Sequence, residues 1–438
     1  MATTPSGRHV WHGWRTAQLA CCLLLALIAG GVARADGATH DPRLAPLREA
    51  MRAHVDAGRY AGIVTLVAQH GRILDVAAVG RARVDAEAPL REDAIMRIAS
   101  MTKPITGVAL MMLLEEGKWS LDDPVAKHIP EFANLQVLAA DGTRVPQATP
   151  MTMRQLVSHS AGLAYGLSLG SPVDAMYREQ RVLDRGTSLD EMIRKLAALP
   201  LAFQPGERWY YSAAVDVQGY LVQKLSGMPF DAFLRTRLFG PLKMADTDFA
   251  LTPAQLPRLA SIHSHDAEGR LVAAPPVGAG GLLGDPTQRP GLPSGGGGLF
   301  STTHDYFRFC QMLLQGGELD GVRILQPATV ALLHANQLPP GVTVGGGISR
   351  AFADLQFGVD VAIVTPAAAA AMGQPAGSYF WGGAFGTWFW IDPANGIVAL
   401  FMVQYRPSAP TALASQAAGR TDVRGEIARL VYEALPPK

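Results

Sequence analysis

Residues 97–104 read Arg-Ile-Ala-Ser-Met-Thr-Lys-Pro and lead into a strongly apolar run, Ile105–Glu116. The run predicts a buried helix, and Pro104 is tolerated only near a helix start, so the helix should begin close to Ser100. Residues three apart share one face of a helix, which brings the Ser100 hydroxyl and the Lys103 amine within hydrogen-bonding reach. This motif alone allows two interpretations. Ser100 and Lys103 form a reactive pair, or Ser100 is an exposed helix-capping residue beside a surface lysine.

A reactive pair would use Ser100 as nucleophile and Lys103 as base. A serine hydroxyl is a weak nucleophile until a base removes its proton, and a lysine acts as that base only when its pKa falls well below ~10.4. Burial lowers the pKa of an amine, and the apolar helix supplies burial. The free N–H groups and the positive dipole end at a helix N-terminus suit stabilisation of an oxyanion. We therefore expect a Lys103 of lowered pKa beside a nucleophilic Ser100.

The composition is that of a folded, enzyme-sized protein. The 438 residues are 48% hydrophobic and 17% charged, with a formal net charge of +1. A nucleic-acid-binding protein would carry a surplus of cations, and a disordered chain would be less apolar, so both classes are disfavoured. The length suffices for one large core or two domains.

The first 35 residues resemble an export signal rather than part of the fold. A basic start precedes the apolar run Ala17–Val32, and Ala33-Arg34-Ala35 supplies a small-x-small cleavage pattern before Asp36. The run is shorter than the ~20 residues of a spanning helix. We expect a periplasmic or secreted protein with no stable membrane span after cleavage. Cys310 would then be its one thiol, so that no internal disulfide could form, and a place in the core is expected for it.

Periodicity predicts an α/β protein of the α+β type, with one sheet built from both ends of the chain. Alternating apolar residues predict a hairpin of Ile63–Ala68 and Ile73–Val79, and a second of Tyr379–Ile391 and Ile397–Gln404. Residues 275–298 and the alanine-rich Pro366–Ala376 are expected to be loops. Helices are expected at Leu44–Ala57, Ile105–Glu116, Thr152–Val157, Ser188–Leu199, Ala213–Leu225, Phe230–Leu238, Thr303–Leu314 and about 420–434.

Four segments, in order, resemble the serine β-lactamase / penicillin-binding-protein superfamily, and most of all its family VIII carboxylesterase branch. They are Arg97–Pro104, Met153–Leu163, Pro205–Ser212, and the pair formed by Gly296–Thr302 with Trp381-Gly382-Gly383. The similarity spans about residues 45–430. It implies a β-lactamase-like fold with a central antiparallel sheet flanked by helices. The single hydrolase domain, 36–438, would consist of a sheet subdomain (about 36–115 plus 290–438) and a mostly helical subdomain (about 116–289).

The resemblance also implies roles for individual residues. Ser100 would be the nucleophile and Lys103 its base, and Tyr211 would pass the serine proton to the leaving group. Tyr210 is the neighbouring alternative, but the family places a serine directly after the functional tyrosine, and Ser212 follows Tyr211. The backbone N–H of Ala384, with that of Ser100, would form the oxyanion hole.

Two departures from the family pattern bear on the substrate. Many relatives carry Asn two residues after the tyrosine, where this chain has Ala213, and many carry Lys-Thr-Gly where it has Trp381-Gly382-Gly383. The indole of Trp381 cannot replace the lysine charge that attracts a substrate carboxylate. It can, however, form one wall of an apolar pocket for the acyl or alcohol part of an ester. The substitutions favour esters over β-lactams and peptides.

Other candidate sites are weaker. Gly166-Leu167-Ser168-Leu169-Gly170 matches the G-x-S-x-G elbow, but that elbow needs a preceding strand, and the residues before Ser168 are loop-like. Histidines 263, 265, 304 and 334 lack metal-ligand spacing, so surface or capping roles are expected for them. The Gly295–Gly298 run lacks the context of a phosphate loop. We therefore expect neither a metal nor a cofactor.

The sequence and the family resemblance together predict an exported, cofactor-free serine hydrolase that cleaves small-molecule esters through an acyl-enzyme on Ser100. The resemblance further implies a preference for short-chain esters. One alternative is a β-lactamase or D-alanyl-D-alanine carboxypeptidase. Another, of a different class, is a penicillin- or cell-wall-recognising module that is acylated without turnover. No nucleic-acid partner is expected, and the sequence specifies no oligomeric state.

Overall fold

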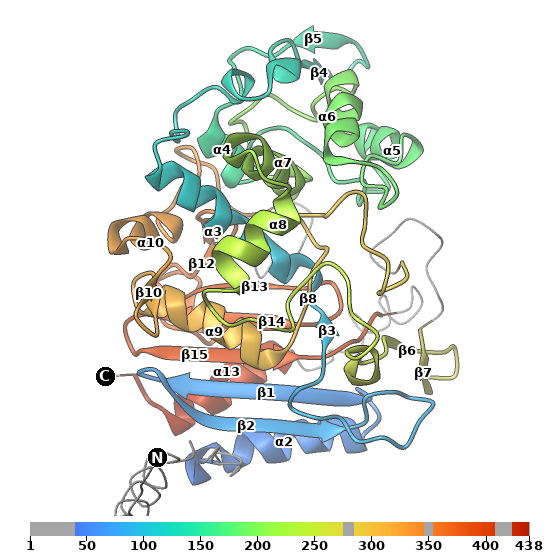
Figure 1. Cartoon of the computed structure of the whole chain (residues 1–438), viewed down its shortest axis with the longest axis vertical. Helices are drawn as coiled ribbons and strands as arrows, with labels where there is room; N and C mark the ends of the chain where they lie inside the picture. The colour runs from blue at the N-terminus through green and yellow to red at the C-terminus, as the bar shows by residue number, and fades with distance from the viewer. Residues whose placement is uncertain (1–39, 275–283, 346–353, 408–422, 438) are drawn as a thin grey trace, which may run out of the picture. The chain divides into compact units, whose positions relative to one another are not determined.

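A seven-stranded antiparallel sheet forms the centre of the protein (Figure 1). The computed structural model describes residues 40–274, 284–345, 354–407 and 423–437, so the predicted signal peptide lies outside the described residues. The sheet order is β11-β12-β13-β14-β15-β1-β2. Its strands are β1 (Gly62–Gln69), β2 (Arg72–Gly80), β11 (Gln356–Phe357), β12 (Ala362–Ile363), β13 (Tyr379–Gly382), β14 (Trp388–Asp392) and β15 (Ile397–Met402).

Strands from the two ends of the chain pair with each other inside this sheet, one strand away from its β2 edge. Strand β1 pairs with β15, with Leu66 opposite Leu400, and β2 follows on the outer side of β1. Four two-stranded ribbons lie outside the sheet. They pair β3 (Met96–Arg97) with β8 (Phe300–Ser301), β4 (Gln136–Leu138) with β5 (Arg144–Pro146), β6 (His263–His265) with β7 (Leu271–Ala273), and β9 (Glu318–Leu319) with β10 (Val322–Arg323).

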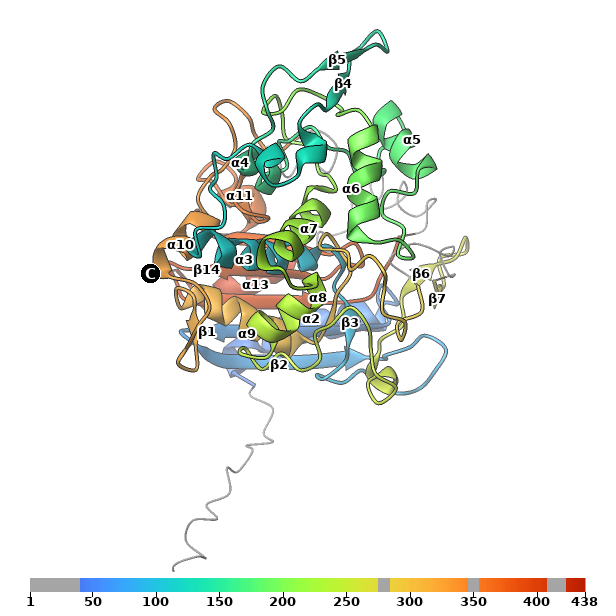
Figure 2. The same ribbon diagram turned by 45° about the horizontal axis from the view of Figure 1, so that its top comes forward.

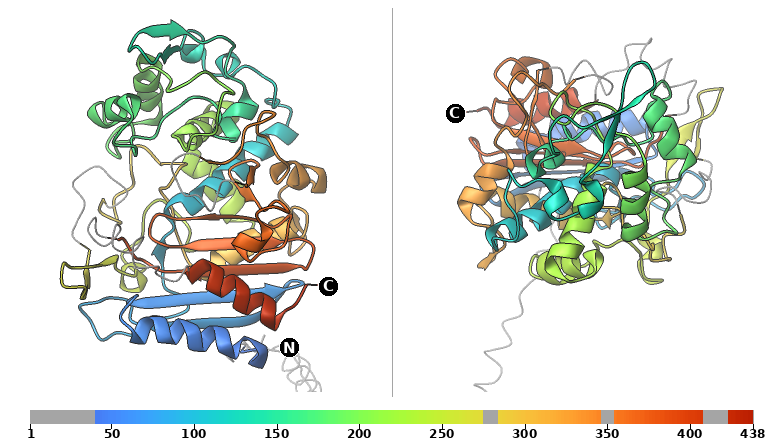
Figure 3. Two further views of the ribbon diagram at one scale, coloured as in Figure 1. Left: turned by 180° about the vertical axis from the view of Figure 1, so that it is seen from behind. Right: turned by 90° about the horizontal axis from the view of Figure 1, so that it is seen from above.

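Helices cover both faces of the sheet and extend beyond one edge. Helix α9 covers one face, while α2 and α13 cover the other (Figures 1 and 3). Helices α4 to α7 lie on the β12 side of β13, away from β1 and β2 (Figure 1), and Figure 2 shows the same group from another angle. The helices are α2 (Ala45–Asp56), α3 (Thr102–Glu115), α4 (Met153–Val157), α5 (Pro172–Glu179), α6 (Leu189–Ala198), α7 (Ala214–Ser226), α8 (Phe230–Leu234), α9 (Thr303–Leu314), α10 (Pro327–Leu333), α11 (Ala369–Met372) and α13 (Val423–Ala434).

Helix α3 runs through the interior and packs against α7. It is apolar on every side, as a fully buried helix must be, and every residue from Thr102 to Leu113 is buried. Its N-terminal end is held by two bonds. Tyr306 of α9 donates to the carbonyl of Met101 (2.8 Å), and Thr102 Oγ1 accepts from Leu299 N (3.2 Å). The start of the helix is therefore fixed against both α9 and the segment before β8.

Most of the expected elements are present, and the expected α+β architecture is confirmed. Two expectations were wrong. The run Tyr379–Ile391 is two strands rather than one, because the chain reverses between β13 and β14 through glycines, with Gly386 at φ +92°. Within the expected loop Pro366–Ala376, residues Ala369–Met372 form α11, in line with the high helix propensity of alanine.

Within the described residues, no helix has both the length and the apolarity needed to cross a bilayer. Cys310 lies buried on α9, in the core position expected for it, and burial raises the pKa of its thiol well above the ordinary value. The division into a sheet subdomain and a helical subdomain stays a prediction.

Candidate active site

Ser100 lies in a tight 3₁₀ turn, Ala99–Met101, directly before α3. Ala99 has a φ of +43°, a left-handed conformation that costs a non-glycine residue free energy and that is common beside functional groups. Ser100 is partly exposed, whereas the residues on either side of it are buried. The Tyr211 hydroxyl lies 2.7 Å from Ser100 Oγ, and Lys103 Nζ lies 3.4 Å from the same atom. The structure thus brings together all three side chains to which the sequence assigned catalysis.

Lys103 is fully buried among aromatic rings. Its Nζ donates to the carbonyl of Gly296 at 2.6 Å and lies 3.5 Å from the Tyr165 hydroxyl. The ammonium also sits 5.0 Å from the ring centroid of Tyr165 and 4.5 Å from that of Tyr211, which is cation–π range. Contacts of this number and strength fix the amine in one position beside Ser100.

The expected lowering of the Lys103 pKa is wrong. Burial acts to lower it, but the oxygens of Tyr165 and Tyr211 and the carboxylate of Asp216 outweigh burial and leave the pKa above its ordinary value. Lys103 is therefore an ammonium in this arrangement. The error has a physical source, because the groups that stabilise the charge come from segments far from Lys103 in the sequence.

Asp216, near the start of α7, anchors the glycine loop that covers Lys103. Its Oδ1 accepts from the Ser294 hydroxyl (2.5 Å) and from the N–H of Gly296 (3.1 Å). Burial raises the pKa of this carboxyl, and the charge of Lys103 opposes the shift. A Cβ added at Gly296 would lie 2.5 Å from Asp216 Oδ2 and 3.1 Å from the Tyr165 hydroxyl, so only glycine fits there.

Sequence reasoning missed three members of this site: Tyr165, Asp216 and the carbonyl of Gly296. Asp216 carried one usable signal, since a carboxylate near the start of an otherwise apolar helix needs a partner. The glycine run was noted as part of one family segment and was also weighed as a phosphate loop, but no contact with Lys103 was assigned to it. Nothing in the local sequence of Tyr165 distinguishes it from an ordinary core tyrosine.

Tyr211 is held within an aromatic cluster. Its ring stacks on Tyr165 (centroids 5.3 Å apart, planes at 19°) and on Trp209 (6.2 Å, 25°), and it leans against Trp381 (5.7 Å). Buried His159 packs on Tyr211 as well (5.0 Å). Burial, together with the charge of Lys103, holds the pKa of His159 well below its ordinary value, so this imidazole is a neutral support.

The turn after β13 approaches the nucleophile segment closely. A Cβ on Gly383 would lie 2.2 Å from Thr387 Oγ1 and 2.4 Å from the carbonyl of Ile98, so glycine is required for this approach. Gly382 is similarly confined, since a Cβ there would lie 3.0 Å from Arg424. Ala384 is exposed in the turn, and the residue after it, Phe385, packs against Ala99. The N–H of Ala384 therefore lies in the turn that packs on the Ser100 segment.

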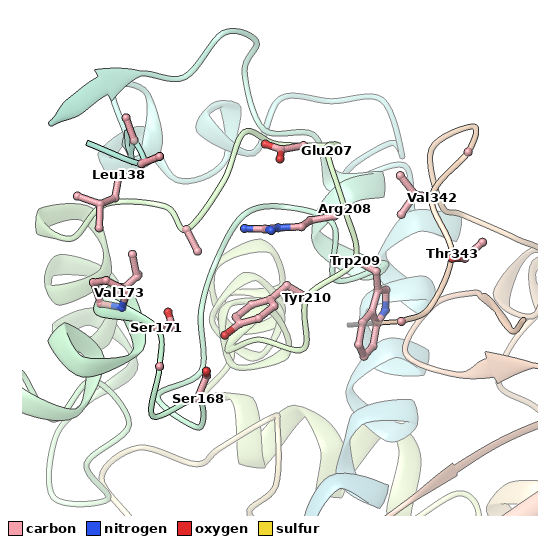
Figure 4. A pocket seen from close by; sticks show the side chains of 17 residues that line it. Leu138, Ser168, Ser171, Val173, Glu207, Arg208, Trp209, Tyr210, Val342 and Thr343 are labelled. Atoms are coloured by element: carbon pink, nitrogen blue, oxygen red, sulfur yellow. The ribbon is translucent and has the colours of Figure 1, made fainter. Parts of the chain in front are cut away.

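Tyr210 and Ser168 lie in a different environment (Figure 4). The Tyr210 hydroxyl donates to Asp174 Oδ2 at 2.7 Å, and Ser168 lies within hydrogen-bonding reach of the same hydroxyl. Both residues line a cavity of about 750 Å³ whose wall includes Arg208 and Trp209. The segment before Ser168 is irregular rather than a strand, so the nucleophile elbow is not formed there.

Of the four histidines expected at surface or capping positions, His304 is exposed and His334 is partly buried, whereas His263 and His265 are buried. His263 Nε2 accepts from the N–H of Ala61 (3.1 Å), and His265 contacts the carbonyl of Gly58 (2.9 Å). Both therefore bind backbone in the core. Among the described residues, no cluster of three or more His, Cys, Asp or Glu side chains has the arrangement of a metal site.

The Beta-lactamase family model matches residues 47–420. The chain belongs to the beta-lactamase family. Esterase EstB of Burkholderia gladioli is 33% identical over 362 residues, which cover 78% of this chain and 86% of that protein. Protein Rv1367c of Mycobacterium tuberculosis is 34% identical over 398 residues, which cover 87% of this chain and 96% of that protein.

A solved structure shares the same fold over most of the chain. EstCE1, described as a hydrolase with promiscuous acyltransferase activity, superposes with a TM-score of 0.72 at 27% identity, covering 90% of this chain and 98% of that one. These findings confirm the β-lactamase-like fold and the family resemblance. The beta-lactamase-family chain is thus a hydrolase of the serine beta-lactamase fold with esterases among its relatives.

Proposed function

We propose that this protein cleaves carboxylic esters through an acyl-enzyme on Ser100. The observation that carries the proposal is the convergence on one serine oxygen of a phenol at 2.7 Å and a buried ammonium at 3.4 Å. A serine hydroxyl in such a setting has both a proton acceptor and a stabilising charge. Trp381 stands where many relatives carry a lysine, which favours uncharged ester groups at that wall.

Tyr211, rather than Lys103, is the immediate acceptor of the serine proton in this mechanism. Lys103 keeps its own proton and stabilises negative charge on the phenol oxygens beside it. Tyr211 takes the proton of Ser100 as Oγ attacks the ester carbonyl and passes a proton to the departing alcohol, so that its own protonation is unchanged over the step. A water molecule repeats the exchange in reverse and releases the acid, so that protons balance over the cycle.

The N–H groups of Ser100 and Ala384 bind the oxyanion in this proposal. Support comes from the close approach of the Gly383 turn to Ile98 and from the contact of Phe385 with Ala99. Donors fixed before the reaction stabilise the developing charge without reorganisation. No metal or cofactor takes part in the proposed cycle.

Ester hydrolysis by matched serine variants tests the proposal. We expect the wild type to turn over p-nitrophenyl butyrate, Ser100→Ala to lose at least about 10³-fold in kcat/KM, and Ser168→Ala to keep the wild-type rate. Fluorophosphonate labelling with peptide mapping should place the adduct on Ser100. Full activity in Ser100→Ala together with loss in Ser168→Ala would show that the wrong serine was chosen.

The preference for short acyl chains and the export of the protein are further parts of the proposal. A series of p-nitrophenyl esters from acetate to palmitate should show kcat/KM falling with chain length. N-terminal sequencing of protein from an exporting host should find Asp36 first. A flat chain-length series, or a retained Met1 in the exported fraction, contradicts the respective part.

A β-lactamase or D-alanyl-D-alanine carboxypeptidase is the second candidate, favoured by the family that the chain belongs to. Ala213 and Trp381 weigh against it, because they replace the amide and the cation common among such relatives. Turnover of nitrocefin at a rate comparable to that of p-nitrophenyl butyrate would favour this candidate. A stable stoichiometric adduct with no product after the first equivalent would instead identify a module that is acylated without turnover.

A further inference from the structure

His159 follows the C-cap of helix α4 in a left-handed backbone conformation. Its φ is +57°, and it stands at the position after a helix end where glycine is the usual residue. Such a φ costs a residue other than glycine free energy, and it persists only where the surrounding structure determines it. The bonds that His159 makes therefore need to be examined one by one.

The proton of the buried imidazole is placed by Ser212. The backbone N–H of Ser212 lies 3.2 Å from His159 Nδ1, and because an amide N–H can only donate, Nδ1 is the acceptor. The Ser212 hydroxyl lies 2.9 Å from the same nitrogen. The ring proton is therefore on Nε2, which has no hydrogen-bond partner among the described residues. His159 thus leaves one buried N–H unpaired, at a cost in free energy, while Nδ1 is paired.

The bonds of His159 hold the residues on both sides of Tyr211. The carbonyl of His159 accepts from the N–H of Tyr210 at 2.9 Å, and its ring accepts from Ser212. The same ring packs on the ring of Tyr211, with the centroids 5.0 Å apart. One residue therefore fixes the residue before Tyr211, the residue after it, and its aromatic ring.

Backbone bonds extend this hold along the chain. The carbonyl of Ser160 accepts from the N–H of Gly206 (2.8 Å), and the carbonyl of Ala164 accepts from the N–H of Ala213 (2.9 Å). The segment that begins at His159 thus runs beside the segment that carries Tyr211. Within this arrangement, the bond to Nδ1 is the side-chain contact directly next to Tyr211.

The catalytic geometry depends on where this segment is held. The hydroxyl of Tyr211 and Oγ of Ser100 are 2.7 Å apart but lie 111 residues apart in the sequence, so no local structure sets their separation. A displacement of ~1 Å at a reacting group can lower a rate by about 10²-fold. A side chain that fixes the backbone on either side of Tyr211 therefore affects the reaction without touching the reacting atoms.

We propose that His159 is a positioning residue that sets the distance between the Tyr211 hydroxyl and Ser100, through the bond from the Ser212 N–H to its Nδ1. This inference rests on the proposed esterase function and adds to it a residue that acts through Tyr211. The role needs a hydrogen-bond acceptor at the place of Nδ1, and it needs neither Nε2 nor a charge on the ring. It accounts for a histidine that is retained despite its φ and its unpaired Nε2–H.

The variants His159→Asn and His159→Gln differ in where the acceptor lies. The amide oxygen of asparagine is attached to Cγ, as Nδ1 is in histidine, whereas that of glutamine lies one carbon farther out, near the place of Nε2. Asparagine also tolerates a positive φ. With p-nitrophenyl butyrate, we expect His159→Gln to lower kcat by about 10²-fold with KM within about threefold of the wild type. His159→Asn should recover at least about tenfold of that loss.

His265→Gln is the matched control. His265 is also buried and also binds the backbone, at the carbonyl of Gly58 (2.9 Å), but it lies outside the site. This variant should keep the wild-type kcat. Urea unfolding of all three variants shows how much stability each substitution removes, and kcat should not follow that order.

A double-mutant cycle with Tyr211→Phe separates positioning from general support of the fold. Without the phenol hydroxyl there is no acceptor to place, so His159→Gln should lower the residual kcat by less than about threefold in that background. A loss of the same factor in both backgrounds overturns the proposal, because His159 would then act independently of the hydroxyl. If His159→Gln does not fold, the same cycle is run with His159→Asn, and any loss should again vanish.

The outcomes distinguish the two proposals. A wild-type kcat in folded His159→Gln, or equal losses in the asparagine and glutamine variants, overturns the positioning role and leaves the esterase proposal standing. Absence of hydrolysis by the wild type, together with absence of a fluorophosphonate adduct on Ser100, overturns both.

Discussion

Two serine–tyrosine pairs lie near the Tyr210–Tyr211 dipeptide, and the charge beside each pair differs in sign. Tyr211 contacts Ser100 next to the ammonium of Lys103. Tyr210 lies beside Ser168 and donates to the carboxylate of Asp174. Burial, and then the bond to Asp174, raises the pKa of Tyr210, so it stays a neutral donor. A phenol beside a cation can accept a proton, whereas a phenol beside an anion holds its own.

The difference also extends to the backbone. In the Ser100 segment, Ala99 has a positive φ and the neighbouring Gly383 has no room for a Cβ. In the Ser168 loop, by contrast, a Cβ on Gly170 would meet no atom within 4 Å. Asp174 Oδ1 accepts from the N–H groups of Gly166 (2.6 Å) and Leu167 (2.9 Å). The first loop carries the proposed nucleophile, and the second is held in place by hydrogen bonds to Asp174. Substitutions at matched positions in the two loops should therefore have different effects.

Removing the ammonium of Lys103 should abolish the difference in reactivity between the Ser100–Tyr211 pair and the Ser168–Tyr210 pair. We expect Lys103→Met to lower kcat/KM for p-nitrophenyl butyrate by about 10⁴-fold, because negative charge that develops on the Tyr211 and Ser100 oxygens then loses its counter-charge. Lys224→Met is the matched control, since Lys224 contacts a tyrosine in the same way (3.3 Å from the Tyr220 hydroxyl) without a serine. It should keep the wild-type rate. A Lys103→Met protein with near-wild-type kcat would contradict the role given to the ammonium.

Removing each phenol hydroxyl in turn should affect different properties. Tyr211→Phe should lower kcat by about 10³-fold, as expected for a lost proton acceptor. Tyr210→Phe removes a bond to a buried carboxylate and should cost about 1–3 kcal/mol of folding free energy instead. Steady-state kinetics and urea unfolding of both variants measure the two effects. Similar kinetic losses in the two variants would mean that the two tyrosines share the role.

Adding one methyl group should distinguish the crowded turn from the relaxed loop. Gly383→Ala places a Cβ against the Ile98 carbonyl and should lower kcat by about 10²-fold by displacing the turn. Gly170→Ala, in the Ser168 loop, meets nothing within 4 Å and should leave both rate and stability unchanged. Kinetics at saturating substrate show the effect. A Gly383→Ala enzyme of normal kcat would remove the turn from the oxyanion site.

The smallest effect concerns Asp174. Burial acts to raise the pKa of this carboxyl, but bonds from Tyr210, Ser171 and the loop amides outweigh it and hold the pKa below 3.8. The carboxylate therefore stabilises the fold above that pH, and the contribution is lost as the pH falls. We expect Asp174→Asn to cost about 1–3 kcal/mol at pH 7 and less below pH 4. Urea unfolding at both pH values tests this, and a deficit that grows in acid would reverse the sign.

Local pattern was enough to predict the helices, the first hairpin and the Ser100–Lys103 spacing, because each depends on neighbours within one or two turns. The position of Tyr211 beside Ser100 followed only from the family resemblance. The reversal at Gly383 was missed because the aromatic residues on both sides read as one strand. Tyr165 and Asp216 were missed because their partners lie far away in the sequence. The pKa of Lys103 depends on these distant groups, so its direction could not be predicted from the motif.

Under the proposed mechanism, the pairing of β1 with β15 determines when a newly made chain can become active. A polypeptide is synthesised from its N-terminus, so Ser100 and Lys103 leave the ribosome long before β15 or the Gly383 turn exists. Until then β1 has one open edge and the nucleophile segment lacks the neighbour that confines it. A nascent chain therefore holds Ser100, the proposed nucleophile, without its final neighbours until β15, the last strand of the described chain, has been added.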